Sequence, residues 1–155
     1  MLCGAGSRGA VKVRHTGIVV ADLDRSLAFY RDLLGLEGVR ELDERGEYID
    51  RITGLDGVRV RTVKLADAGG GLVELLKFES HPRPPRGDRS AADPGCSHVA
   101  FTVEDIEGAY RRLSAAGIHF HAPPQLAPDG GAKVTYCRDP EGTIIELVQV
   151  LAPSR

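Results

Sequence analysis

Short apolar runs followed by a helical pattern occur twice along the chain. The first copy has a strand-like run over residues 16–20 and Leu23, Leu27, Tyr30 and Leu34 at helical spacing. The second copy has a strand-like run over residues 99–103 and apolar positions at helical spacing over residues 106–113. The same order of features at two places predicts an internal repeat.

Polar and glycine residues bound the two expected helices in the same way. Asp22 and Asp105 stand directly before the helical patterns and are placed to act as N-caps. Gly35 and Gly117 follow the patterns, as glycines that terminate helices do.

Each expected helix is followed by three further strand-like segments. In the first half they cover about 39–48, 58–65 and 71–76, and in the second half about 119–122, 133–136 and 142–148. Each half therefore predicts the order β-α-β-β-β, which makes the fold class α+β.

The halves are too small to fold separately and are expected to pack together. Residues 11–79 form the first predicted module and residues 96–151 the second, within a single domain over 11–151. The stretch 80–95 is rich in Pro, Arg and Gly and is interpreted as the linker. Residues 1–10 are Gly-rich and are expected to be a flexible tail.

Composition narrows the classes of partner. The 155 residues are 42% hydrophobic and 27% charged, with 20 Lys and Arg against 22 Asp and Glu, a profile typical of a globular chain without a basic face for nucleic acid. No apolar run approaches the ~20 residues of a membrane span, so we expect neither nucleic acid nor membrane as a partner. The N-terminus has no apolar signal segment, so the expected location is cytoplasmic, and the three cysteines are expected to be reduced.

Four ionisable residues interrupt strand faces that are otherwise apolar or small. They are His15, Glu74, His98 and Glu146. Taken singly, such a His is more often a hydrogen-bonded structural residue, and such a Glu more often lies on a solvated face. The repeat changes this interpretation, because modules related by a pseudo-twofold axis bring two imidazoles and two carboxylates around one point. Such a set suits a divalent cation.

Several ordered motifs together resemble the vicinal oxygen chelate superfamily, which includes glyoxalase I, methylmalonyl-CoA epimerase, extradiol dioxygenases and bleomycin-resistance proteins. The resemblance covers about residues 11–151. It is carried by His15-Thr16-Gly17-Ile18-Val19-Val20 with Asp22, residues 29–36, Val73-Glu74-Leu75-Leu76, His98-Val99-Ala100-Phe101 with residues 103–106, and residues 139–142 with Ile145-Glu146-Leu147-Val148.

The resemblance implies a fold and a ligand set. Proteins of this kind pair βαβββ modules into a cupped mixed sheet around a metal, with ligands from the first and fourth strands of each module. Mapped onto this sequence, the ligands are His15, Glu74, His98 and Glu146. One divalent ion per site is expected, zinc foremost, with nickel, cobalt and manganese as alternatives. The resemblance also implies a homodimer. Whether the two modules of one chain or modules of two chains form the site stays open.

The chemistry expected at such a site is proton transfer beside a carbonyl. A six-coordinate ion with four protein ligands keeps two adjacent positions for a small substrate with oxygens on neighbouring carbons, and it stabilises the chelated enediolate. Glu74 and Glu146 come from opposite modules, so one can remove a proton and the other return it, as catalytic bases of an epimerase or isomerase. Which carboxylate serves which face stays open.

Two further histidines and one turn have weaker interpretations. His119 and His121 alternate onto one strand face and are candidate substrate-binding residues, with the outer surface as the alternative. The stretch 138–142 reads as a turn whose charges serve that turn.

The substrate remains the largest open question. The stretch 48–55 resembles the sequences of an actinobacterial branch of the superfamily. Some members of this branch epimerise cyclitol ketones such as 2-epi-5-epi-valiolone. One alternative is a glyoxalase I-type lactoylglutathione lyase with the same ligand types. Another is a metal-free, drug-binding resistance protein, although such proteins lack the quartet and this chain is only 5% aromatic. Dioxygenase chemistry is disfavoured, because it uses two histidines and one carboxylate.

Overall fold

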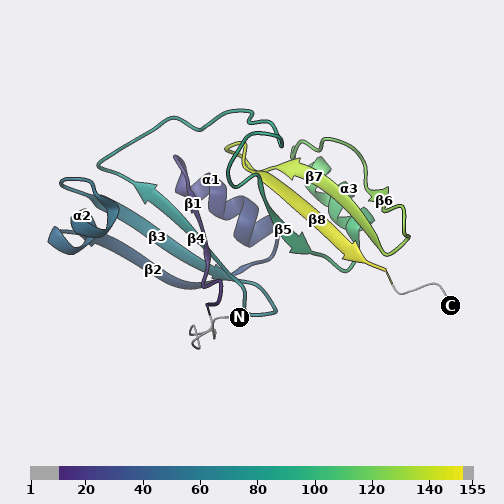
Figure 1. Cartoon of the computed structure of the whole chain (residues 1–155), viewed down its shortest axis with the longest axis horizontal. Helices are drawn as coiled ribbons and strands as arrows, with labels where there is room; N and C mark the ends of the chain where they lie inside the picture. The colour runs from purple at the N-terminus through teal and green to yellow at the C-terminus, as the bar shows by residue number, and fades with distance from the viewer. Residues whose placement is uncertain (1–10, 152–155) are drawn as a thin grey trace, which may run out of the picture.

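The computed structural model describes residues 11–151, which form two modules of similar design (Figure 1). The first module contains β1 (Thr16–Val19), α1 (Leu23–Leu27), a π-helical continuation η1 (Ala28–Leu33), β2 (Glu37–Arg45), α2 (Glu47–Thr53), β3 (Arg59–Ala66) and β4 (Leu72–Phe78). The second contains β5 (His98–Thr102), α3 (Ile106–Ala115), β6 (Gln125–Leu126), β7 (Ala132–Arg138) and β8 (Ile144–Val150). The predicted α+β class and the repeat are confirmed.

Each module has its own four-stranded mixed sheet. The strand orders are β1-β4-β3-β2 and β5-β8-β7-β6, so the first strand of each module pairs with the last. The pairings β1–β4 and β5–β8 are parallel, and the other pairings are antiparallel. Figure 1 shows the two sheets as separate leaves on either side of α1.

The predicted helix boundaries are confirmed. The side chain of Asp22 accepts a hydrogen bond from the backbone N–H of Arg25, and Asp105 does the same for Gly108, so both act as N-caps. Gly35 and Gly117 follow the helices with φ of 83° and 86°, a left-handed conformation that costs glycine little.

Three local details differ from the expectation. The second strand ends at Arg45, because Gly46 with φ of 99° turns the chain and residues 47–53 form α2. A strand over 119–122 is wrong: only Phe120 bridges to Cys137, and the outer strand of the second sheet is the two-residue β6. Over a segment as short as 119–122, the alternation of apolar and polar residues does not distinguish a strand from a loop with a single β-bridge.

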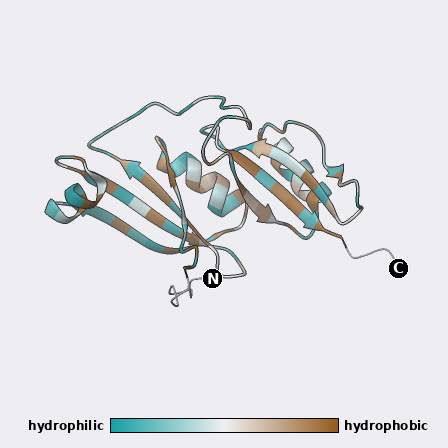
Figure 2. Ribbon diagram, viewed as in Figure 1, coloured by the Kyte–Doolittle hydropathy of each residue, from teal (hydrophilic) through white to brown (hydrophobic). Residues whose placement is uncertain are grey.

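The core lies between the helices and one face of each sheet. Two polar residues interrupt the apolar run of each of β4 and β8, and Figure 2 shows β8 as a brown arrow with teal bands. Leu75 on β4 and Leu147 on β8 are fully buried in one apolar cluster with Ile106 of α3. Glu74 and Glu146 lie on the opposite faces of the sheets, which are turned away from this core.

A buried polar contact joins the modules. The hydroxyl of Tyr30 donates to Asp139 Oδ2 at 2.7 Å, and both residues are buried. Burial and the nearby Asp139 carboxylate hold the pKa of Tyr30 far above its ordinary value, so the phenol stays neutral. Glu141 accepts hydrogen bonds from the backbone N–H groups of Ala21 and Asp22 at 2.7 and 2.6 Å. The charges of the 138–142 turn therefore hold the first module, and the interpretation that they serve only the turn is wrong.

Two further expectations concern the cysteines and membrane-spanning segments. Cys96 and Cys137 carry free thiols, as expected, and Cys3 lies outside the described residues. Burial and Asp139 raise the pKa of the Cys137 thiol to about 12. Within residues 11–151 there is no helix of the length and apolar character needed to span a bilayer.

Tyr30→Phe should destabilise the protein by about 1–3 kcal/mol, because it leaves a buried carboxylate oxygen of Asp139 without its donor. Urea unfolding of the two proteins measures the difference. Tyr48→Phe is the matched control, since Tyr48 is 69% exposed, and it should change the free energy of unfolding by less than about 0.5 kcal/mol. Equal unfolding midpoints for Y30F and the wild type would contradict this role of Tyr30.

Candidate metal centre

The first pair of candidate ligands lies where β1 begins. His15 directly precedes β1, and Gly17, two residues later, is the register partner of Glu74 on β4. Because side chains two residues apart share a face, His15 and Glu74 project from the same side of the sheet. His15 Nε2 lies 3.0 Å from Glu74 Oε2, and both side chains are half-buried.

The second pair repeats this construction. His98 is the first residue of β5, and Ala100, two residues later, is the register partner of Glu146 on β8. His98 Nε2 lies 2.9 Å from Glu146 Oε2, again with both side chains half-buried. The two modules therefore repeat the same strand register and nearly the same His–Glu distance, as well as the order of elements predicted from the sequence.

The two pairs do not meet within one chain. Among residues 11–151, no group of three or more His, Cys, Asp or Glu residues is close enough to hold a metal ion. The pairs belong to different sheets, and these sheets share no strand pairing. The described part of one chain thus holds two separate His–Glu pairs, called half-sites below for the site they are proposed to form, and it does not meet the expectation of four donors around one point.

The spacing within each pair suits ligands of one ion. Two donors about 2.1 Å from an ion and at right angles to one another lie about 3.0 Å apart. The distances of 3.0 and 2.9 Å match this value, and imidazole with carboxylate is a donor set that zinc and similar ions accept. The same distances suit direct hydrogen bonds, which keep each pair assembled on its own.

The carboxylates have different neighbours at equivalent positions. Lys64 is the register partner of Glu74, and its Nζ lies 3.6 Å from Glu74 Oε1. Tyr136 is the register partner of Glu146, and burial together with the Glu146 charge raises the pKa of this phenol. The two half-sites are therefore chemically unequal: one carboxylate faces a cation and the other faces a neutral ring.

The two histidines also differ in the hydrogen-bond partner of their second ring nitrogen, Nδ1. Ser97 Oγ lies 2.7 Å from His98 Nδ1, so a hydroxyl orients this ring with Nε2 toward Glu146. His15 Nδ1 is buried and has no hydrogen-bond partner within the described part of the chain.

Sequence reasoning missed Lys64, Tyr136 and Ser97. A signal for the first two exists, because each stands ten residues before its glutamate, which is the spacing that one hairpin register produces in both modules.

The candidate substrate-binding histidines extend from the second pair. The ring centroids of His98 and Tyr136 are 5.2 Å apart, those of Tyr136 and His121 6.2 Å, and those of His121 and His119 6.4 Å. His119 and His121 are both exposed. They therefore continue a row of rings away from Glu146 toward solvent, and their contact with a substrate stays a prediction.

Comparison with known families identifies the fold. The family model described as "Glyoxalase/Bleomycin resistance protein/Dioxygenase superfamily" matches residues 12–147. The chain belongs to this superfamily. The resemblance drawn from its motifs is thereby confirmed.

Individual relatives carry several functions. A 2-epi-5-epi-valiolone epimerase from Actinomyces sp is 27% identical, with 97% of this chain and 86% of the relative covered. A probable lactoylglutathione lyase from Synechocystis sp. is 29% identical over 87% of this chain and 92% of the relative. Among solved structures, a glyoxalase family protein from Bacillus cereus is 26% identical with a TM-score of 0.86 over 96% of this chain and 100% of that one. The superfamily is therefore settled, and the specific activity is not.

Proposed function

We propose that two chains of this protein pair so that the first module of one and the second module of the other complete a four-ligand metal site. The supporting observation is the pair of His–Glu contacts at 3.0 and 2.9 Å in matched register, each of which would supply two of the four protein ligands of a six-coordinate ion. In a twofold dimer of this kind each half-site is used once, so two equal sites form.

The proposed activity is that of a metal-dependent epimerase or isomerase. A divalent ion bound by the quartet would acidify the C–H beside a substrate carbonyl and stabilise the charge that develops on neighbouring oxygens. The substrate is a small molecule with oxygens on adjacent carbons, and the Actinomyces relative favours a cyclitol ketone such as 2-epi-5-epi-valiolone.

The protein's own residues supply the proton transfers. Glu74 and Glu146 come from different modules and therefore face a bound substrate from different sides. Glu74 is held by Lys64, whereas Glu146 has no cationic side chain as its register partner, so Glu146 is the carboxylate that is freer to leave the ion and accept the proton. Glu74, in its protonated form, would return a proton from the opposite side and so invert the carbon, and the proton taken by Glu146 would then pass to solvent.

A lactoylglutathione lyase is the second candidate. It is favoured by relatives such as the Synechocystis protein, and it would use the same two half-sites. An assay with methylglyoxal and glutathione separates the two activities, and a metal-free, drug-binding protein would show neither activity nor a bound ion.

Mixing two disabled chains tests the assembly. His15→Ala and His98→Ala should each abolish tight Co²⁺ binding, because each removes one donor from every site. After subunit exchange in a 1:1 mixture, about half of the dimers carry both variants, and each of these has one intact site, so about one quarter of the wild-type Co²⁺ capacity should return. Isothermal titration of each variant and of the mixture measures this. No recovery from the mixture would contradict a site shared between chains.

Proton exchange tests the reaction. In D₂O the wild type should incorporate deuterium beside the carbonyl of its substrate, screened over cyclitol ketones that include 2-epi-5-epi-valiolone. Glu146→Gln should lower this exchange by about 10²–10⁴-fold, because the amide cannot accept the proton. NMR measures the exchange, and Glu104→Gln on the exposed surface is the control. Retained exchange in E146Q would exclude Glu146 as the base.

Ser97→Ala should weaken Co²⁺ binding by about 10–100-fold, because the His98 ring loses the partner of its Nδ1. The control is Ser80→Ala, since Ser80 Oγ lies 2.8 Å from Nδ1 of His81, a histidine outside the quartet. Titration with Co²⁺ should leave S80A unchanged. Equal losses in S97A and S80A would show that the effect is not specific to the proposed site.

A further inference from the structure

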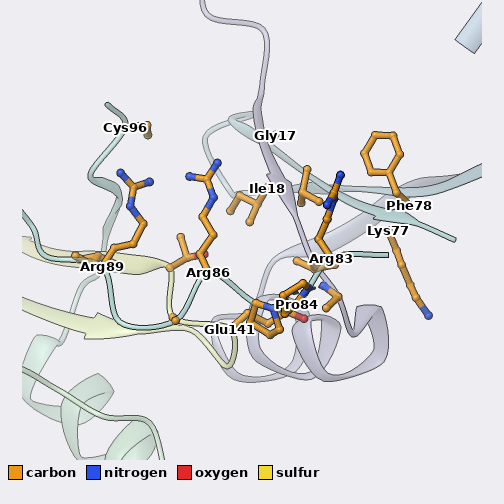
Figure 3. A pocket seen from close by; sticks show the side chains of 18 of the residues that line it. Gly17, Ile18, Lys77, Phe78, Arg83, Pro84, Arg86, Arg89, Cys96 and Glu141 are labelled. Atoms are coloured by element: carbon orange, nitrogen blue, oxygen red, sulfur yellow. Dashed lines mark hydrogen bonds between the residues drawn. The ribbon is translucent and has the colours of Figure 1, made fainter. Parts of the chain in front are cut away.

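A cavity of about 580 Å³ lies between the two modules, and neither Glu74 nor Glu146 is among the residues that line it. Its walls are β1, the beginnings of β5 and β8, and the segment 81–90 that follows β4 (Figure 3). This volume lies within the range of pockets that hold small molecules.

Basic side chains outnumber free acids in the lining. The lining includes Lys77, His81, Arg83, Arg86 and Arg89. The acids of the lining are Glu79 and Glu141, and both are engaged: Glu79 lies 3.4 Å from Lys77 Nζ, and Glu141 accepts two backbone N–H groups. Lys and Arg side chains thus outnumber Glu side chains in the lining, and its formal charge is positive.

Two of the arginines have no counter-charge within the described part of the chain. Arg89 donates to Pro94 O at 3.2 Å and lies 3.8 Å from Asp93 Oδ2. Arg83 and Arg86 have neither a hydrogen bond nor an ion pair with any residue in the range 11–151. Figure 3 shows the side chains of Arg83, Arg86 and Arg89 extending to the same side of their segment, with Arg83 and Arg86 on either side of Ile18 of β1 in this view. Guanidinium groups so placed are available to an anion.

The segment that carries these arginines is anchored to the second module. Arg138 donates from Nη2 to the carbonyl of Arg89 at 2.7 Å and from Nη1 to the carbonyl of Gly142 at 3.0 Å. Gly142, with φ of 94°, lies so close to the segment that a Cβ would stand 2.6 Å from the carbonyl oxygen of Gly87. The arginines are thus presented from a fixed backbone, which lowers the entropy cost of binding.

The free edge of β1 adds backbone donors to the cavity. The N–H of Val20 bonds to Leu76 of β4, and the N–H of Ala21 points the other way, to Glu141. Since N–H directions alternate along a strand, the N–H groups of Gly17 and Val19 also point away from β4, on the side that lines the cavity.

We propose that this cavity binds a small molecule carrying a phosphate group, held by Arg83 and Arg86, with an apolar part packed against Ile18 and Phe78. Two uncompensated guanidinium groups match a phosphate dianion better than a single carboxylate. His98 also lines the cavity, so the bound molecule reaches the second half-site. The inference that the bound molecule is a phosphorylated substrate rests on the proposed function. The inference that the cavity binds an anion does not.

Phenyl phosphate is the probe, because it combines a dianion with an apolar ring. Isothermal titration of the full chain at fixed ionic strength should show saturable binding, and the double variant Arg83→Gln/Arg86→Gln should raise the Kd at least about tenfold, which corresponds to about 1.4 kcal/mol. The matched control, Arg111→Gln/Arg112→Gln on the exposed face of α3, removes the same charge and should change the Kd less than about twofold.

Three outcomes would overturn the proposal: no saturable binding to the wild type, an equal loss in both double variants, or phenylacetate binding as tightly as phenyl phosphate. Glu146→Gln separates the anion site from the proposed reaction, because it should abolish proton exchange and keep phenyl phosphate binding. Phenyl phosphate binding without proton exchange on any ketone would end the proposed reaction and leave the anion site standing.

Discussion

The parallel pairing of the first and last strand in each module is the constraint on which the candidate site depends. It places the residue two positions after each histidine opposite a glutamate, at Gly17 and Glu74 and again at Ala100 and Glu146. Strand alternation then projects each histidine and its glutamate from one face at 3.0 or 2.9 Å. A shift of one residue in either register would turn the glutamate into the apolar core.

A second constraint determines how the modules sit relative to each other. The Tyr30–Asp139 hydrogen bond and the contacts of Glu141 to the start of α1 join the first module to the β7–β8 turn. The helix-covered faces share one apolar core, while the faces with the His–Glu pairs belong to separate sheets. This arrangement keeps the two His–Glu pairs apart within residues 11–151, and the proposed pairing of two chains would bring them together.

The two modules differ at equivalent positions around their glutamates and histidines. Equivalent hairpin positions carry Lys64 beside Glu74 and Tyr136 beside Glu146, and only the second histidine has a serine at its other nitrogen. Unequal carboxylates suit the proposed reaction, in which one carboxylate removes a proton and the other returns one. The arginine-bearing segment between β4 and β5 has no counterpart within a module, so it can add substrate selectivity without disturbing either pair.

Much of this protein follows from local signals in its sequence. The duplicated order of strands and helix, the caps Asp22 and Asp105, the glycines after the helices and the four polar residues on apolar strand faces were all predicted, because strand alternation, helical periodicity and capping act over a few residues. Long-range packing decided the rest. Packing set the separation of the two His–Glu pairs. It also brought Glu141 to the first module and Arg138 to Arg89, contacts between residues that are 120 and 49 positions apart. No local pattern encodes such contacts, since they arise only when whole modules pack.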